Sequence, residues 1–490
     1  MASSTDASSG RSRTAWSTFS FVVMHLLLAI PTAGVNRVVL GAPPCGPRAP
    51  RLETPVATPH DDGMAERRRL RGEKGRVDGP DAKRHVHPPA GTHGGVSGPP
   101  GHEYPYPWVR LRSGTAHPLI FQRMVGDVDP AARAGDIVAV YDKTGRHFGH
   151  AFYHDRSQIA LRMLSYDAAP IDDAFFRERL ARAVGWRQRL FAGDETTNVY
   201  RLVHAEGDDL SGLIAERYGD WMAIEIFSLG VARRINLFKR LLGELTGLTR
   251  FVVRADERIC RLEGFHVPAD ASNAAPETVT VRENGIRFRV DMQAGHKTGF
   301  FCDQRENRRR LAAFCGSASV LDVCCYTGGF GIYAKKLGGA ESVTGVDLDE
   351  KAIDLAKRNA DLNQVRIDHV HADAFAYLRQ MQQNGRSYDV VVLDPSKFIA
   401  SREEYEEGSR KYVDLNTLGM SVVKPGGLLL TCSCSGLVSP SDFVSLVKAA
   451  ATRLRRRLQI VDQTGAGPDH PVMANCPESA YLKAVWARVL

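Results

Sequence analysis

The sequence predicts an α/β protein whose C-terminal domain is built on a doubly wound parallel sheet. From residue 294 onward, apolar runs alternate with segments of helical period, which is typical of parallel strands joined by crossover helices. The runs are continuous, as expected for strands covered on both faces; they read SVLDVCC, SVTGVDLD, YDVVVLD and GGLLLTCSC. Residues 349–363 keep a 3.6-residue period and are predicted to form a helix between two of these strands.

Two smaller domains are predicted before this sheet, since 490 residues are too many for one core. Residues 108–175 hold short β-like runs separated by Gly, Asp and Pro, which predict a small β barrel. Residues 176–293 predict an α+β domain. An amphipathic helix over 172–191 leads into it, followed by a pair of strands, a helix at 232–245 and a strand at 250–256.

Residues 1–107 are predicted to be a disordered extension, because they are rich in Pro, Gly, Ser, His and Arg with little apolar periodicity. The apolar stretch 19–30 is short for a membrane span. With Arg11 and Arg13 before it, the stretch resembles a signal peptide; the composition also resembles a transit peptide, and a true start at Met64 is a third explanation.

The overall composition, 43% hydrophobic and 24% charged residues, is that of a globular protein. A net charge of +8 favours a polyanionic partner without identifying one. The nine cysteines form no CxxC pair and lie mainly in apolar runs, which suits a reducing compartment, so we expect a cytoplasmic protein. We expect neither a metal site nor a membrane association.

Acidic residues and glycines stand where the predicted parallel strands end. Asp322 is followed by a loop with Gly328 and Gly329, Asp347 ends the second strand, and Asp373 follows the third. Parallel sheets bind ligands at this edge. Because neither G-x-G-x-x-G nor G-x-x-x-x-G-K-[ST] is present, a nucleoside cofactor without phosphates fits best, and S-adenosylmethionine meets that description. The alternative is that these acids are helix N-caps.

The fourth and fifth strands end in a carboxylate and a thiol. Asp394 precedes Pro395 on a stiff turn, able to hold the hydrogen-bonding edge of a base, and Cys434 leaves the sheet beside it. A thiolate that adds to C6 of a pyrimidine makes C5 nucleophilic enough to accept a methyl group. Cys432 has the same strand parity but lies deeper, so it is predicted to belong to the core.

Several motifs together resemble the bacterial large-subunit (23S) ribosomal RNA cytosine-C5 methyltransferases, in the order of the predicted domains over about 108–490. They are GHKTGFFCDQRENR (295–308), YTGGF (326–330), DPSKF (394–398), SCSGL (433–437), DHPV and PESAYLKA. The resemblance implies an N-terminal PUA domain that binds RNA, a central domain and a Rossmann-like class I methyltransferase domain. It also implies that Cys434 is the nucleophile and that Asp394 orients the base. The implied S-adenosylmethionine ligands are Asp322, Tyr326, Thr327, Gly328, Gly329, Asp347, Asp373, Gln304 and Arg305. Ser396 stands where the family usually has a second Pro, which puts the detailed shape of that loop in doubt.

The resemblance therefore predicts an enzyme that forms 5-methylcytosine in ribosomal RNA. The clusters NRRR (307–310) and RLRRR (453–457), together with Lys297 and Arg305, are candidate phosphate contacts or ordinary surface charges. Two alternatives stay open: an RNA methyltransferase acting on an exocyclic amine, which needs no cysteine, and a non-catalytic RNA-binding ribosome assembly factor. The oligomeric state, a homodimer included, is not predicted.

Overall fold

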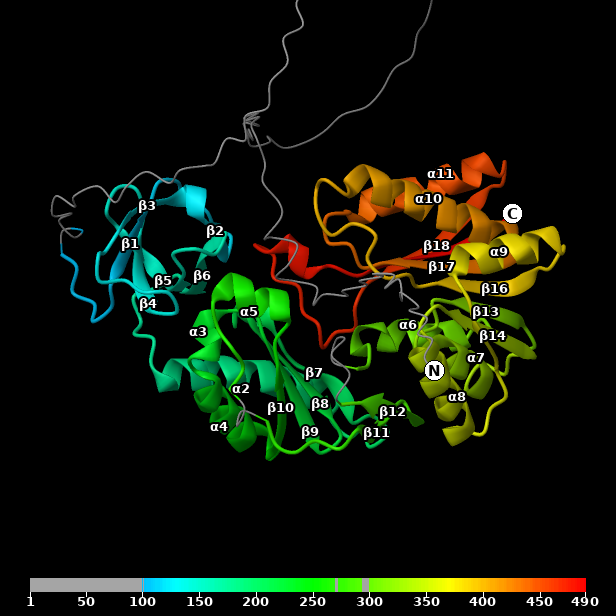
Figure 1. The fold of residues 1–490 in the computed structure, drawn as a ribbon, viewed down its shortest axis with the longest axis horizontal. Coiled ribbons are helices and arrows are strands. Elements are labelled where there is room, and N and C mark those ends of the chain that lie inside the picture. Colours follow the sequence, from blue (N-terminus) through cyan, green and yellow to red (C-terminus); the bar gives the residue numbers. More distant parts are fainter. Residues whose placement is uncertain (1–98, 100, 269–271, 293–298) are drawn as a thin grey trace, which may run out of the picture. The chain divides into compact units, whose positions relative to one another are not determined.

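The computed structural model describes residue 99 and residues 101–268, 272–292 and 299–490 (Figure 1). The predicted disordered extension, with its signal-peptide, transit-peptide and start-site explanations, lies outside these residues, apart from residues 99 and 101–107. Among the described residues, no helix combines the length and apolar character that crossing a membrane requires.

The first described domain is a six-stranded sheet with the order β2-β6-β5-β4-β1-β3. All its neighbouring strands are antiparallel except β1 and β4. Val109, Val138, Val140 and Leu161 are among the apolar side chains of its own buried cluster. The strands are β1 Trp108–Leu111, β2 Leu119–Phe121, β3 Val125–Val128, β4 Ile137–Tyr141, β5 His147–Tyr153 and β6 Ile159–Ser165.

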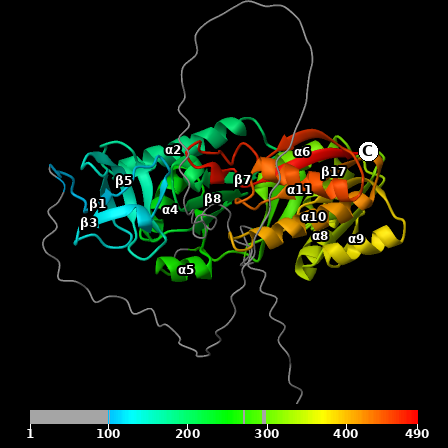
Figure 2. The ribbon, with the colours of Figure 1, turned by 90° about the horizontal axis from the view of Figure 1, so that it is seen from above.

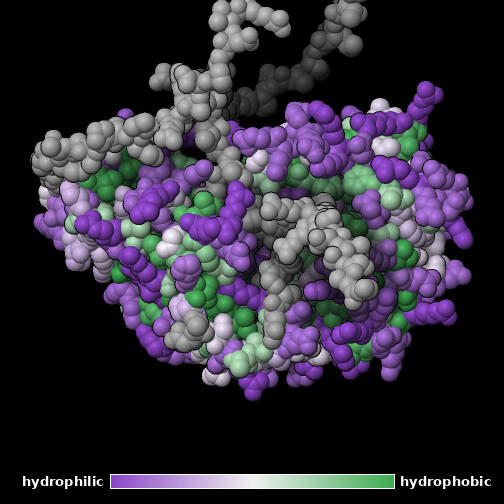
Figure 3. All heavy atoms as spheres, in the orientation of Figure 1, coloured by the Kyte–Doolittle hydropathy of each residue, from purple (hydrophilic) through white to green (hydrophobic). Residues whose placement is uncertain are grey.

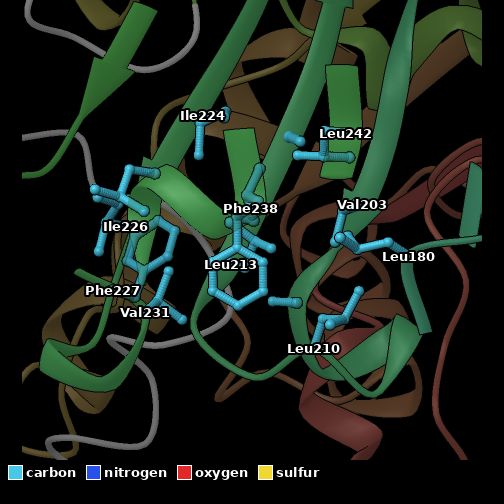
Figure 4. Packing of buried hydrophobic residues seen from close by; sticks show 14 of the residues in the cluster. Leu180, Val203, Leu210, Leu213, Ile224, Ile226, Phe227, Val231, Phe238 and Leu242 are labelled. Atoms are coloured by element: carbon cyan, nitrogen blue, oxygen red, sulfur yellow. The ribbon is translucent and has the colours of Figure 1, made fainter. Parts of the chain in front are cut away.

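The central region is a four-stranded sheet, β10-β9-β8-β7, with helices packed on it and a two-stranded hairpin beside it. Helix α2 (Asp173–Leu190) packs on β7 (Figure 2) and begins at Asp172, whose side chain accepts a hydrogen bond from the Phe175 N–H. Figure 4 shows its Leu180 in one apolar cluster with residues of the strands and of α4. The elements are β7 Val199–His204, β8 Leu213–Tyr218, β9 Trp221–Ile226, α3 Leu229–Ala232, α4 Ile235–Thr246, β10 Arg250–Arg254, α5 Glu257–Glu263, β11 Thr278–Glu283 and β12 Ile286–Asp291.

The C-terminal sheet has seven strands in the order β15-β14-β13-β16-β17-β19-β18, and all are parallel except β19. Helices α9, α10 and α11 lie on one side of the sheet, and α6, α7 and α8 on the other (Figure 1). The strands are β13 Ser319–Val323, β14 Ser342–Asp347, β15 Asp368–His371, β16 Tyr388–Leu393, β17 Val423–Ser433, β18 Leu458–Thr464 and β19 Lys483–Val489. The helices are α6 Arg305–Ala312, α7 Gly329–Lys336, α8 Glu350–Leu362, α9 Ala374–Gln383, α10 Tyr405–Ser421 and α11 Pro440–Arg453.

The predicted doubly wound sheet is confirmed, including the helix expected over 349–363, which is α8. Strand order reverses at β13, which has β14 on one side and β16 on the other. Such a reversal opens a crevice at the carboxyl ends of the two central strands, where ligands bind. The face drawn in Figure 3 is mostly hydrophilic, as expected once the buried clusters have taken the large apolar side chains inside.

Candidate active site

Asp322 lies one residue before the carboxyl end of β13, the strand at which the order reverses, and is fully buried. Its Oδ2 accepts a hydrogen bond from the Gly331 N–H of α7 at 2.9 Å, whereas its Oδ1 is buried with no hydrogen-bond partner among the described residues. Burial raises the pKa of Asp322 to about 7, and the charges of Asp394 and Asp347 act in the same direction. An unsatisfied buried oxygen at a sheet's ligand-binding edge suits a hydrogen-bond donor from a ligand.

The loop after β13 has an unusual backbone. Cys324, Tyr326 and Gly328 have φ values of 63°, 50° and 82°, in the left-handed region that non-glycine residues seldom adopt. Asp347, at the end of β14, stabilises this loop, because its Oδ2 accepts the Tyr326 N–H at 2.8 Å. Positive φ values at non-glycine residues such as Cys324 and Tyr326 indicate backbone strain, which is often found at ligand-binding sites.

The structure brings the four acids of the strand ends together around this loop. Burial raises the pKa of Cys324 well above its ordinary value, and the charges of four carboxylates raise it further. The four are Asp347, Asp394, Asp322 and Asp373. Asp373 is also the exposed N-cap of α9, whose side chain accepts the Ala376 N–H at 2.9 Å, so the capping alternative applies to it at least in part.

Asp394 and Cys434 follow the neighbouring strands β16 and β17. The Gln304 Nε2 donates to Asp394 Oδ2 at 3.1 Å, and Gln304 is itself held by the Asn307 Nδ2 at 2.6 Å. The Cys434 thiol donates to the carbonyl of Pro395, the next residue after Asp394, with an S–O distance of 3.9 Å. The prediction that Cys434 lies beside the Asp394 turn is therefore confirmed in position.

The two serines around Cys434 explain its orientation. The Ser433 and Ser435 hydroxyls both bond the buried Tyr412 hydroxyl of α10, each at 2.9 Å. Because successive side chains of an extended segment point to opposite sides, Cys434 faces away from α10. Its thiol is 8% exposed and packs against Tyr481 and Leu482, while Cys432 is fully buried in the sheet core, as predicted.

Some of the predicted basic residues have internal partners. Arg305 is buried and forms two hydrogen bonds to Asp469, at 2.7 and 3.1 Å, so its predicted place beside the cofactor stays a prediction. Arg308 is buried in a bidentate pair with Glu283. Arg456 donates to three backbone carbonyls, those of Met420, Val423 and Val489. Arg308 and Arg456 are thus engaged inside the fold, whereas phosphate contacts by the exposed arginines of the two clusters stay a prediction; Lys297 lies outside the described residues.

Comparison with known proteins decides the family. The profile of the S-adenosylmethionine-dependent methyltransferases matches residues 201–488, and that of the PUA-like domains matches residues 110–166. Ribosomal RNA large subunit methyltransferase I of Aliivibrio fischeri (strain MJ11) is 36% identical over 380 residues, which cover 76% of this chain and 96% of the relative. The chain belongs to the S-adenosylmethionine-dependent methyltransferase family. The protein of the same name from Shewanella amazonensis is 37% identical, over 76% of this chain and 95% of that relative.

Solved structures agree at the level of the fold. The chain superposes on SMU.776, a methyltransferase candidate crystallised with SAH, with a TM-score of 0.66 and 21% sequence identity. The match covers 76% of this chain and 96% of that one. A structure from Streptococcus mutans gives the same TM-score with 20% identity, over 78% and 99% of the two chains.

S-adenosylmethionine is the cofactor of this methyltransferase, and the crevice residues fit it. Its sulfonium and ammonium are positive, which suits an edge lined by Asp322, Asp347, Asp373 and Asp394. The free Oδ1 of Asp322 offers a buried acceptor. When bound, the cofactor supplies an electrophilic methyl group.

Sequence reasoning missed several residues of the site. Tyr412 orients the serines, Asn307 holds Gln304, and Lys483 binds the backbone next to Cys434. Lys483 lies in the PESAYLKA motif, so the sequence did mark its segment as part of the family pattern. The spacing gave no reason to connect the lysine with Cys434, 49 positions earlier.

Proposed function

We propose that this methyltransferase forms 5-methylcytosine in large-subunit (23S) ribosomal RNA through a covalent bond between Cys434 and C6 of the base. The observation that carries the proposal is the thiol of Cys434 next to Pro395, at the same sheet edge as the carboxylates that fit the cofactor. The relatives named as ribosomal RNA large subunit methyltransferases support the RNA substrate. Such a protein works where ribosomes assemble, in the cytoplasm.

The chemistry requires a thiol at this place. The Cys434 thiol loses its proton to solvent, and the thiolate forms a bond to C6 while the C5–C6 double-bond electrons move toward the ring carbonyl and N3. The enamine-like C5 then takes the methyl group. Loss of the C5 proton to water lets the S–C6 bond break, which returns its electrons to sulfur and restores the aromatic ring.

Asp394 is proposed to hold the base while the thiol adds. A carboxylate can accept from the exocyclic amine of cytosine and hydrogen-bond at N3. Gln304 donates a hydrogen bond to one oxygen of Asp394 and so helps to orient the carboxylate. Ser396, partly buried after Pro395, replaces the usual Pro of the family without removing the carboxylate or the thiol.

The remaining assignments follow the same reading. The proposed cofactor ligands are Asp322, Tyr326, Thr327, Gly328, Gly329, Asp347, Asp373, Gln304 and Arg305. Residues 108–175 are proposed as the RNA-binding PUA-like domain, 176–293 as the central domain and 294–490 as the catalytic domain. The PUA-like match at residues 110–166 supports an RNA-binding role for the first of them.

A trapping experiment tests the covalent route. Large-subunit RNA fragments that contain 5-fluorocytidine cannot release the C5 substituent, so the wild-type protein with S-adenosylmethionine should form an adduct that survives denaturing electrophoresis. Cys434→Ala should form no adduct and methylate no cytosine. Cys432→Ala, a matched change on the same strand face, should retain both activities.

The same variants separate this reaction from its alternative. If Cys434→Ala still methylates RNA and the product is an exocyclic N-methyl base, the covalent proposal is wrong. Mass mapping of ribosomal RNA from cells with and without the gene identifies the modified nucleotide.

A further inference from the structure

Lys483 is a buried lysine beside the proposed nucleophile. It is the first residue of β19 and pairs directly with Ser433 of β17, the residue before Cys434. Its side chain is only 5% exposed. Directly opposed residues of antiparallel strands lie on the same face, so the lysine side chain starts on the side of Ser433, and its ammonium reaches the backbone carbonyl that follows Cys434.

The contacts of the ammonium are with neutral groups. Its Nζ donates to the Ser435 carbonyl at 2.5 Å and to the Tyr481 carbonyl at 2.8 Å. Among the described residues, no carboxylate lies within ion-pair distance of it. The two carbonyls belong to the residue after Cys434 and to a residue that packs against the thiol. Lys483 therefore ties together the two segments that enclose the sulfur.

A buried ammonium without a carboxylate is unfavourable unless another anion is near. Burial lowers the pKa of Lys483 to about 8, and the negative charge of a Cys434 thiolate opposes that shift. The interaction is mutual, because a thiolate that stabilises an ammonium is stabilised by it to the same extent. Nearby positive charge is what makes a cysteine reactive near neutral pH.

Two other titratable groups interact with Cys434, and neither carries a positive charge. Tyr412 of α10 and Cys432 of β17 both interact electrostatically with Cys434, and in both cases the interaction raises their pKa. Asp394, after β16, acts on Cys432 in the same direction. Neither Tyr412 nor Cys432 offers a positive charge to a Cys434 thiolate, whereas Lys483 does.

We propose that Lys483 is a positioning residue for Cys434: its ammonium fixes the turn that carries the thiol and stabilises the thiolate. The inference rests on the proposed covalent route. Lys483 stays protonated throughout, and the proton of the thiol leaves to solvent. After the S–C6 bond breaks, the ammonium again faces the thiolate.

The test measures the reactivity of the thiol and needs no RNA. Full-length wild type, Lys483→Met, Lys483→Gln and Lys483→Arg are alkylated with iodoacetamide over a pH series, and modification of Cys434 is followed by peptide mass spectrometry. An opposite charge at close range shifts a thiol's titration by about 1–3 pH units. Lys483→Met and Lys483→Gln should therefore move the alkylation midpoint of Cys434 upward by at least about one unit, and Lys483→Arg should stay close to wild type.

Two controls complete the design. Lys424→Met removes a lysine near the start of β17, the strand that leads to Cys434. Lys424 pairs with Asp389, and its removal should leave the alkylation midpoint of Cys434 unchanged. Circular dichroism establishes that each variant is folded, and Lys483→Gln keeps hydrogen-bonding capacity without charge should the methionine variant fail to fold. An unchanged midpoint in a folded neutral variant overturns the inference.

A purely structural role has a different signature. It would slow adduct formation with 5-fluorocytidine RNA by the same factor at every pH and leave the alkylation midpoint in place, which also overturns the inference. Failure of the proposed function can be told apart from failure of this inference. If the covalent route is wrong, Cys434→Ala still methylates RNA, and this result does not depend on how the Lys483 variants change the alkylation of Cys434.

Discussion

Asp322 carries the most informative titration of the site. Its carboxyl is fully buried, has one free oxygen, and titrates at a pKa of about 7 because burial disfavours its charge. Since that value is raised above the ordinary one near 4, Asp322 alone makes folding less favourable as the pH rises from about 4 to about 7. A cationic ligand reverses the preference, because it favours the ionised carboxylate.

Cofactor affinity should therefore depend on pH through Asp322. Isothermal titration calorimetry with S-adenosylmethionine should show tighter binding at pH 8 than at pH 6. Asp322→Asn should bind at least about tenfold more weakly at pH 8, a loss of about 1.4 kcal/mol, and its affinity should be nearly independent of pH over this range.

The matched control is Asp389→Asn, at the start of β16, whose Oδ2 accepts from Ser319 and Lys424. It should leave affinity and its pH dependence unchanged. Wild-type affinity that is flat from pH 6 to 8 contradicts the assignment of Asp322 to the cofactor.

At the scale of elements, α10 and β17 act as a unit that presents the thiol. Tyr412 of the helix binds the hydroxyls of Ser433 and Ser435, and the Ser435 Oγ also accepts the Ile399 N–H at 3.2 Å. The strand end is thus held from the helix layer, and the loop after Asp394 is attached to the same serine. Cys434 is positioned by groups that take no part in the proposed chemistry.

Removal of this hydroxyl should loosen the strand end. Tyr412→Phe leaves buried serine hydroxyls with fewer partners and should lower the free energy of unfolding by about 1–2 kcal/mol. The rate of adduct formation with 5-fluorocytidine RNA should fall as well. Tyr405→Phe, at the first residue of the same helix, is the control. It should change the free energy of unfolding by no more than about 0.5 kcal/mol and should leave the rate of adduct formation close to that of wild type. Equal adduct rates in wild type and Tyr412→Phe would show that the bridge does not position the thiol.

These elements mark the limit of what the sequence predicts. Continuous apolar strands and helical periods predicted the sheet, its helices and the acids at its edge, because those signals are local. The side-chain partners were not predictable in this way: Tyr412 and Ser433 are 21 residues apart, and Arg305 and Asp469 are 164 apart. The internal partners of Arg308 and Arg456 could not be predicted for the same reason, since they too lie far along the chain.

At the scale of the whole chain, the segment after β18 connects the domains. The Asp469 carboxylate accepts hydrogen bonds from the Arg305 side chain of α6. Its Oδ2 also accepts the backbone N–H of Arg201, in β7, at 2.9 Å. Its carbonyl accepts from Arg187 of α2 at 2.6 Å. Farther along, Glu478 pairs with His117 of the first domain at 3.1 Å. The DHPV and PESAYLKA motifs thus contact α2, β7 and the first sheet region through Asp469 and Glu478.

The buried pair of Arg305 and Asp469 should dominate acid stability. Burial alone would raise the pKa of Asp469, but His470 and Arg305 hold it well below its ordinary range. Because the folded value is depressed, the stabilising contribution is complete above the unfolded pKa near 4 and is lost as the pH falls through the folded value. Asp469→Asn removes the buried partner of Arg305 and leaves it only the half-exposed Glu306, so it should lower the free energy of unfolding by about 3 kcal/mol at pH 7.

Urea denaturation at pH 7, 5 and 3 measures this effect. The difference between wild type and Asp469→Asn should be the same at pH 7 and 5 and should shrink at pH 3, where Asp469 is protonated in the unfolded chain but still charged in the folded one. Asp462→Asn breaks a more exposed pair with Arg310 and should lose at most about 1 kcal/mol. A difference that grows toward pH 3 would contradict the depressed pKa, because it would mean that the carboxylate destabilises the fold where it is charged.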